Sequence, residues 1–156
     1  MKPVLVEGDL LDQKVEVIVN PWNRNFIPWW LLWPQGVSGA IKRRAGYQPF
    51  RELGRLGIIP LGGAVETSAG RLPFRAIIHV AGLNSFWVSS EKTVRKCVSS
   101  ALQLAQQQGY RSIAFPLIGA GTGGMNPERV LTLMCEESAL IPYEGEICFV
   151  RFHLSV

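Results

Sequence analysis

The chain has 156 residues, of which 47% are hydrophobic and 18% are charged. These proportions exclude a disordered or fibrous chain, and the length is that of one domain with a sizeable core, so we expect a single domain over residues 1–156. The net charge of +4 favours anionic partners such as phosphates or nucleic acid, although many surfaces with other roles carry a similar excess.

The cysteines and histidines exclude the common metal and disulfide frameworks. Cys97, Cys135 and Cys148 have no C-x-x-C spacing, and only two histidines accompany them. We therefore expect no metal, no cofactor and a reducing, cytoplasmic location. The first two residues lead directly into a strand-like segment, so no secretory signal is expected. The longest apolar run, 26–34, is too short to span a membrane core of about 30 Å.

Short apolar runs and glycine- or proline-rich breaks predict strands and helices that alternate along the chain. Strands are expected over residues 3–7, 15–19, 63–67, 76–81, 112–115 and 146–153, and helices over residues 36–46, 50–56, 90–108 and 127–140. The helix over 90–108 is the clearest, because Val94, Val98, Ala101 and Ala105 repeat at helical spacing. This alternation predicts a largely parallel sheet with helices on both faces.

A glycine-rich stretch joins the strand over 112–115 to the next helix. It consists of Ile118, Gly119, Ala120, Gly121, Thr122, Gly123, Gly124 and Met125. Asn126 is expected to cap the helix, with Pro127 at its first position. Glycines let backbone N–H groups approach a ligand, and a helix N-terminus favours an anion. The stretch is a candidate phosphate site, and a tight turn without a ligand is the alternative.

Three further segments accompany the glycine-rich stretch in a fixed order. They are Gly8-Asp9-Leu10, Asn20-Pro21-Trp22-Asn23 and Gly36-Val37-Ser38-Gly39-Ala40-Ile41. Together the four segments resemble the macrodomain family, the ADP-ribose-binding module, over about Val4 to Phe152. The resemblance implies a three-layer α/β/α fold around a mixed six-stranded central sheet, with the ligand cleft at the strand ends.

The resemblance also implies which residues hold the two ends of ADP-ribose. Asp9, with Gly8 and the Leu10 backbone beside it, matches the carboxylate that accepts a hydrogen bond from the adenine amino group; capping a turn is the alternative. Phe152 matches an aromatic position that packs on adenine, with ordinary core packing as the alternative. Asn23 is expected to face the distal ribose. We also expect Asn20, its partner in the motif, among the ligand contacts, although its main expected role is to tie down the turn.

The same resemblance implies two loops around the diphosphate. The first is expected to bind it through Gly36, Val37, Ser38, Gly39 and Ile41. The second is expected to bind it through Ile118, Gly119, Ala120, Gly121, Thr122, Gly123, Gly124 and Met125.

The chain departs from the catalytic pattern that the family implies. Ser38 stands where hydrolase-type members carry an acid, and none of the twelve acidic residues falls between Asn20 and Arg51 or between Leu117 and Pro127. A general acid or base must lie within hydrogen-bond reach of the proton it moves. We therefore expect a module that binds ADP-ribose, free or attached to a protein.

A catalytic alternative stays open at this point. An ADP-ribosyl hydrolase or an O-acetyl-ADP-ribose deacetylase would need Asn23 and a substrate phosphate to hold the attacking water. Otherwise His79 or Glu66 would have to approach the site through the fold, although a histidine in a strand is more often structural.

Two features fall outside the resemblance. Four of the five tryptophans lie between Trp22 and Trp33, and we expect the segment 26–33 to form a lid over the distal ribose or a partner surface, with the filling of a gap in the core as the alternative. Lys42, Arg43 and Arg44 predict a basic cluster that would bind poly(ADP-ribose) or nucleic acid, weakening as salt rises.

Overall fold

The structure, a computed structural model, describes residues 2–31, 36–83, 89–120 and 124–152. The predicted loop residues Gly121, Thr122 and Gly123, and the end of the tryptophan-rich segment, lie outside these ranges. The strands are β1 (Val4–Gly8), β2 (Val17–Asn23), β3 (Ala64–Thr67), β4 (Ala76–Leu83), β5 (Ser112–Pro116) and β6 (Glu146–Phe152). The helices are α1 (Gly36–Ala45), α2 (Gln48–Arg55), α3 (Glu91–Gln107) and α4 (Pro127–Leu140), with 3-10 turns η1 (Leu10–Asp12) and η2 (Trp29–Leu31).

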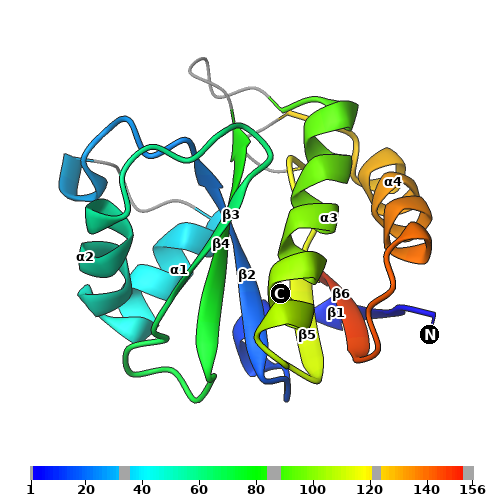
Figure 1. The fold of residues 1–156 in the computed structure, drawn as a ribbon, viewed down its shortest axis with the longest axis horizontal. Helices are drawn as coiled ribbons and strands as arrows, with labels where there is room; N and C mark the ends of the chain where they lie inside the picture. The colour runs from blue at the N-terminus through cyan, green and yellow to red at the C-terminus, as the bar shows by residue number, and fades with distance from the viewer. Residues whose placement is uncertain (1, 32–35, 84–88, 121–123, 153–156) are drawn as a thin grey trace.

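The strands form one six-stranded sheet in the order β1-β6-β5-β2-β4-β3. Only the β3–β4 pair is antiparallel among the described strands, so the predicted mixed sheet is confirmed. Figure 1 shows α1 and α2 beside one face of the sheet and α3 and α4 beside the other, which gives the three expected layers. No helix in the described ranges is long and apolar enough to cross a membrane.

β2 extends four residues beyond its predicted end. It continues through Pro21 to Asn23 and pairs with β4 along this whole length. A proline normally interrupts a central strand because it has no N–H to donate. Here the pairing of β2 with β5 covers only Val17 and Ile18, so beyond Ile18 that side of the strand requires no donor. The extension carries Asn20 and Asn23 to the edge of the sheet as part of a regular strand.

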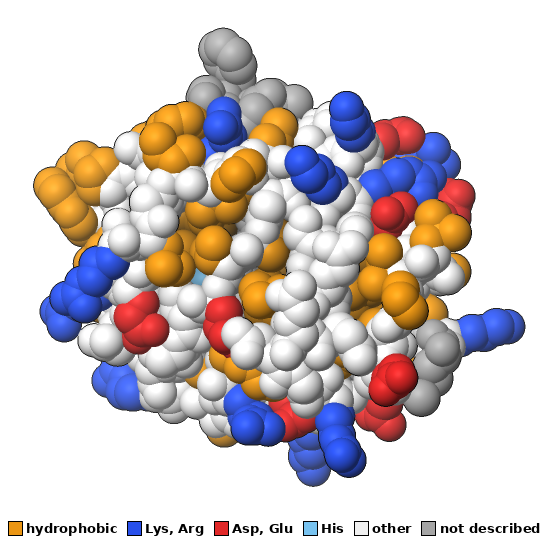
Figure 2. Space-filling view, viewed as in Figure 1, with side chains coloured by type: hydrophobic (Ala, Val, Ile, Leu, Met, Phe, Trp, Pro, Cys, Tyr) orange, Lys and Arg blue, Asp and Glu red, His pale blue; other side chains and the backbone are white. Residues whose placement is uncertain are grey.

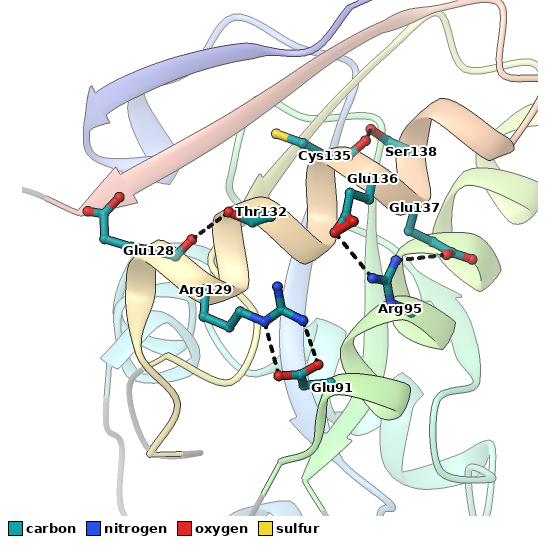
Figure 3. Close-up of polar contacts among 9 residues, drawn as sticks. All are labelled: Glu91, Arg95, Glu128, Arg129, Thr132, Cys135, Glu136, Glu137 and Ser138. Carbon is teal, nitrogen blue, oxygen red and sulfur yellow. Dashed lines mark hydrogen bonds and ion pairs between the residues drawn. The ribbon is translucent and has the colours of Figure 1, made fainter.

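The face of the sheet under α3 and α4 packs a continuous apolar core. Phe115 and Phe149 meet edge to face, with ring centroids 5.7 Å apart. Ion pairs join the two helices at the surface (Figure 3): Arg129 donates through Nε and Nη2 to both carboxylate oxygens of Glu91, at 3.0 and 2.9 Å. In the next turns, Arg95 lies 3.2 Å from Glu136 and 3.7 Å from Glu137.

The face under α1 and α2 has a core of its own, built around fully buried Ile18, Ile41, Phe50 and Leu53. It also buries a set of polar side chains that lead from the sheet interior to the start of α1. They position the candidate site.

Candidate functional site at the strand ends

Five neighbouring parallel strands bring the predicted segments to one edge of the sheet. β1, β6, β5, β2 and β4 run in the same direction, so their carboxyl ends lie together. The chain leaves β2 toward α1 on one face and leaves the adjacent β5 toward α4 on the other (Figure 1). Ligand crevices of open α/β sheets form at such a switch point. The predicted loops therefore flank one crevice.

The first loop is the start of α1. Gly36, with a φ of +51°, opens the helix, and Val37 and Ser38 after it are partly buried. Backbone N–H groups in the first turn of a helix have no partner within the helix, and they attract anions. Gly39 is buried and Ile41 is fully buried, so Ile41 supports the loop from below instead of presenting a surface to a ligand.

Ser38 is held by the end of β2. Its hydroxyl donates to the Asn20 side-chain oxygen at 2.7 Å and approaches the Pro21 carbonyl at 3.2 Å. Both partners are acceptors, so the single hydroxyl proton points into the protein. The remaining capacity of the oxygen is to accept a hydrogen bond. Ser38 thus offers an acceptor at the position where a carboxylate was expected in catalytic relatives.

Asn20 begins a buried chain of hydrogen bonds below Ser38. Its amide nitrogen lies 3.0 Å from His79 Nδ1, and His79 Nε2 lies 2.8 Å from Thr67 Oγ1, which donates to the Ser68 carbonyl. Because the Asn20 amide donates to Nδ1, Nε2 carries the histidine proton. Asn20 is 0% exposed, so it lies beneath the site in the expected structural role, and the expectation that it also contacts the ligand does not fit its burial.

His79 does not supply an acid or base to the site. Burial lowers its pKa to about 3, and both ring nitrogens are occupied, so the imidazole is neutral at physiological pH. Glu66 hydrogen-bonds to the hydroxyl of Tyr110. Tyr110 lies in the loop before β5, at the amino ends of the parallel strands and so at the edge opposite the crevice. Burial, followed by the contact with Glu66, raises the pKa of Tyr110 to about 12. Neither His79 nor Glu66 therefore reaches the crevice as an acid or base.

Asn23 is nearly buried at the end of β2. Its side-chain oxygen accepts from the backbone of Asn25 at 2.7 Å, and its amide nitrogen donates to no residue in the described part of the chain. Asn25 has a φ of +68°, and its amide nitrogen donates to the carbonyls of Leu53 and Gly57, both at 2.8 Å. Sequence reasoning missed Asn25, although asparagine is among the few residues that adopt this conformation readily.

The second loop begins at Gly119, which no other residue can replace without strain. Its φ is +84°, and a Cβ there would lie 2.8 Å from the Ser89 hydroxyl. The Met125 amide donates to the Gly119 carbonyl at 3.0 Å, so the two described ends of the loop are tied together. Asn126 caps α4 through Glu128 and Arg129 amides, as predicted. Ile118 is fully buried and supports the loop from the core, whereas Ala120 is partly buried and Gly124 is exposed.

Ser89 is an unpredicted neighbour of this loop. The residue is 8% exposed, and its buried hydroxyl oxygen has no hydrogen-bond partner among the described residues. Buried hydroxyl groups are almost always hydrogen-bonded, so the lack of a partner singles this one out. No sequence signal separates it from Ser90, the N-cap of α3.

Asp9 and Phe152 lie at the ends of neighbouring strands. Gly8 of β1 pairs in register with Phe152 of β6, and Asp9 follows Gly8. One Asp9 oxygen caps η1 by accepting from Leu11 N at 2.9 Å, so the predicted turn-capping role is present; Leu10 itself is buried. Phe152 is 64% exposed, which excludes the core-packing alternative.

The predicted basic cluster does not form. Lys42 is 8% exposed, and its ammonium donates to the Trp29 carbonyl at 3.3 Å while lying 5.2 Å from the Trp22 ring. Burial lowers the pKa of Lys42. Arg44 pairs with Asp9 and Asp12, at 3.9 and 3.5 Å. Residues adjacent on a helix point in different directions, so the run of three cations in the sequence is divided among three environments.

The tryptophan-rich segment divides in the same way. Trp29 is partly buried against the core under α1 and α2, 6.3 Å from the Phe50 ring, as the core-filling alternative predicted, and Trp22, just before the segment, is buried. Phe26 and Trp30 are 51% and 66% exposed. Trp33 lies outside the described residues. Among the residues that the structure describes, no group of three or more His, Cys, Asp or Glu side chains could hold a metal ion.

Comparison with known proteins agrees with this architecture. Residues 19–134 match the profile of the Macro domain family. The O-acetyl-ADP-ribose deacetylase of Escherichia fergusonii is 38% identical over 128 residues, covering 77% of this chain and 68% of that protein.

Two solved structures have the same fold. A mutant of the Oceanobacillus iheyensis macrodomain with ADPR superposes with a TM-score of 0.81 at 26% identity, covering 95% of this chain and 83% of that one. The Trypanosoma brucei macrodomain in complex with ADP-ribose gives 0.77 at 27% identity, covering 95% of this chain and 62% of that one. With the family profile spanning most of the sequence and the sheet, helices and loops in the matching order, the chain belongs to the Macro domain family.

Proposed function

We propose that this chain is a single macrodomain that binds ADP-ribose, free or attached to a protein, in the crevice between the start of α1 and the loop after β5. The observation that carries the proposal is that the start of α1 and the loop after β5 meet at the switch point. The first turn of a helix attracts anions, and the other loop opens at Gly119 beside Ser89, whose hydroxyl has no partner among the described residues. The relatives solved with ADPR and ADP-ribose support the choice of ligand.

Each part of the ligand has a matching group. The diphosphate lies between the N–H groups of the first turn of α1 and the second loop. The Asp9 oxygen that does not cap η1, which lies 3.9 Å from Arg44, accepts from the adenine amino group, and the exposed Phe152 ring packs on the base. At the distal ribose, the Asn23 amide donates and Ser38 accepts.

Hydrolysis is a second candidate function, favoured by the relative that is named O-acetyl-ADP-ribose deacetylase. A water held by Ser38 as acceptor would attack the acetyl carbonyl carbon, and its proton would pass to a substrate phosphate oxygen. The ester C–O bond then breaks, the phosphate passes that proton to the departing ribose oxygen, and acetic acid leaves and ionises to acetate. The acid that normally supplies such steps has no counterpart in either loop of this sequence.

Calorimetric titration with ADP-ribose, ADP and AMP tests the proposal. We expect saturable binding that is much tighter for ADP-ribose than for AMP, and no binding would refute it. Asp9→Ala should weaken binding by about tenfold, because a hydrogen bond to a charged group is lost. Asp12→Ala is the matched control, since Asp12 also pairs with Arg44 but lies on η1. Release of acetate from O-acetyl-ADP-ribose distinguishes the enzyme from the binding module.

We also propose a cytoplasmic location. It rests on Cys97, Cys135 and Cys148, which are all unpaired. Unpaired cysteines persist in reducing compartments. Alkylation of the denatured protein, purified without reductant, should label all three thiols.

A further inference from the structure

Two adjoining hollows lie on the outer side of α2, away from the strand-end crevice. The first, about 390 Å³, is lined by Phe26, Trp30, Arg51 and Arg55 among others. The second, about 540 Å³, lies between the end of α1 and the start of α2, and Arg51 lines it as well. The first turn of α1 faces the crevice, whereas its last turn lines the second hollow. The second hollow is therefore separate from the proposed ADP-ribose site, and the first lies beyond Asn25, which leads the chain away from Asn23.

The hollows carry positive charge without a matching negative charge. Arg43, Arg51, Arg55 and Arg71 are exposed and line one hollow or both. None of them forms an ion pair with a carboxylate in the described ranges, and no residue that lines either hollow is acidic. Glu52, also on α2, is occupied by Ser68 and Gln48. Four cations thus face solvent where an anion can approach them.

Exposed aromatic rings lie beside these cations. Tyr47, Arg51 and Arg55 follow one another at four-residue spacing, so they lie along one side of α2. Tyr47 is 57% and Trp30 is 66% exposed, and Trp29 packs against Tyr47 from below. Figure 2 shows hydrophobic side chains at the left edge of the molecule, over η2, with Lys or Arg side chains below them. Large exposed rings beside unpaired cations are a costly surface unless a partner covers them.

We propose that this surface, the α2 groove, binds single-stranded nucleic acid. The arginines contact the phosphate backbone, and the exposed rings of Tyr47, Trp30 and Phe26 stack on bases. Proteins that bind single strands without sequence preference combine these two elements, a positive groove and stacking platforms. A duplex would satisfy the arginines but keep its bases paired, leaving the rings uncovered. The aromatic content therefore selects the single strand.

Fluorescence anisotropy of a labelled 20-nucleotide single-stranded RNA tests the proposal on the whole chain. We expect tighter binding to the single strand than to a duplex of the same sequence. Contacts from four cations predict that the logarithm of affinity falls with the logarithm of salt concentration with a slope of about −3. Equal or tighter binding to the duplex, or no binding to either, would overturn the proposal.

Substitutions locate the binding to the groove. The double variant Arg51→Glu and Arg55→Glu should lose about tenfold or more in RNA affinity and show a shallower salt slope. Trp30→Ala should lose at least about fivefold with an unchanged slope, because it removes stacking and no charge. Lys92→Glu makes the same charge change as Arg51→Glu alone, but on α3, on the other face of the sheet, and should change affinity much less than Arg51→Glu does.

Two controls separate this groove from the crevice. The Arg51→Glu and Arg55→Glu variant should retain its ADP-ribose affinity and melting temperature, which shows that the fold and the crevice are intact. If Lys92→Glu loses as much RNA affinity as Arg51→Glu alone, overall charge and not the groove holds the RNA, which would overturn the proposal. Binding of poly(ADP-ribose) but not of RNA would overturn it as well.

Discussion

The two faces of the sheet are built on different principles. Under α3 and α4, aliphatic and phenylalanine side chains fill the core, and the surface charges of the two helices pair with each other (Figure 3). Under α1 and α2, the core contains a fully buried His79, a fully buried Asn20 and an almost buried Lys42. On the outside of that face, four arginines have no carboxylate partner among the described residues.

This difference separates stability from recognition. Apolar packing and paired surface charges stabilise a fold but offer nothing to a ligand. Buried polar groups require partners throughout the core, and they fix the direction in which a surface group such as Ser38 presents its lone pairs. The α1–α2 face contains such hydrogen-bonded polar groups where it meets the crevice, and the α3–α4 face provides the rigid support.

The largest expected effect is a truncation in the apolar face. Phe149→Ala should lower the free energy of unfolding by about 3–5 kcal/mol, because the ring is 1% exposed and the cavity cannot collapse. Urea denaturation measures the loss, and Phe149→Leu should lose much less. A loss below about 1 kcal/mol in the alanine variant would show that this face is loosely packed.

Removing a member of the buried polar chain should lower the free energy of unfolding by less than the phenylalanine truncation does. Asn20→Ala leaves His79 Nδ1 without its donor, and we expect a loss of about 1–3 kcal/mol in the free energy of unfolding. Asn126→Ala, which removes the exposed cap of α4, is the control and should lose about 1 kcal/mol. The interpretation fails if Asn20→Ala is no more destabilising than Asn126→Ala.

A smaller effect, spread over pH, comes from His79. Its folded pKa of about 3 lies below the ordinary value of 6.5, so between these values the unfolded chain binds a proton that the native state does not. Stability contributed by the neutral ring is therefore complete above about pH 6.5 and falls with decreasing pH, by about 1.4 kcal/mol per unit. Urea denaturation at pH 6 and pH 5 measures the slope. It should be clearly flatter in His79→Gln, and an unchanged slope would contradict the assignment.

The smallest effect is expected at the ion pair between α3 and α4. Both Glu91 and Arg129 are about half exposed, so water and salt screen their attraction. Glu91→Gln should lower the melting temperature by no more than a few degrees at low salt, and the difference should vanish in 1 M salt. The double variant with Arg129→Gln should show no further loss. A large drop in melting temperature that persists at high salt would mean that the pair stabilises the fold by contacts that salt does not screen.

Much of the fold follows from local signals in the sequence. The helical spacing of Val94, Val98 and Ala101 and the cap at Asn126 placed α3 and α4 close to their observed bounds. The meeting of the loops at one edge follows from the parallel strands alone. Glycine at position 119 also carried a signal, since its positive φ is one that other residues rarely adopt.

The remainder depends on contacts between distant residues. Asn20 could be a ligand group or a structural one until His79, 59 residues away, is known to be its partner. Lys42 is turned inward by the Trp29 carbonyl and the Trp22 ring, and this packing leaves no trace in the local charge pattern. Whether the Ser89 hydroxyl finds a hydrogen-bond partner among the described residues depends on the tertiary packing around it, which the local sequence does not specify.

The chain from Ser38 through Asn20 and His79 to Thr67 has one further consequence. Every member donates in the same direction, away from the crevice and toward the Ser68 carbonyl. Ser38 cannot turn its proton toward a ligand without losing its bond to Asn20 or reversing the whole chain, and reversal removes the Thr67 bond to the Ser68 carbonyl. The Ser38 hydroxyl therefore favours ligand groups that donate. Hydroxyl groups and water can donate to it, whereas carbonyl, carboxylate and phosphate oxygens must be held by the backbone N–H groups beside it.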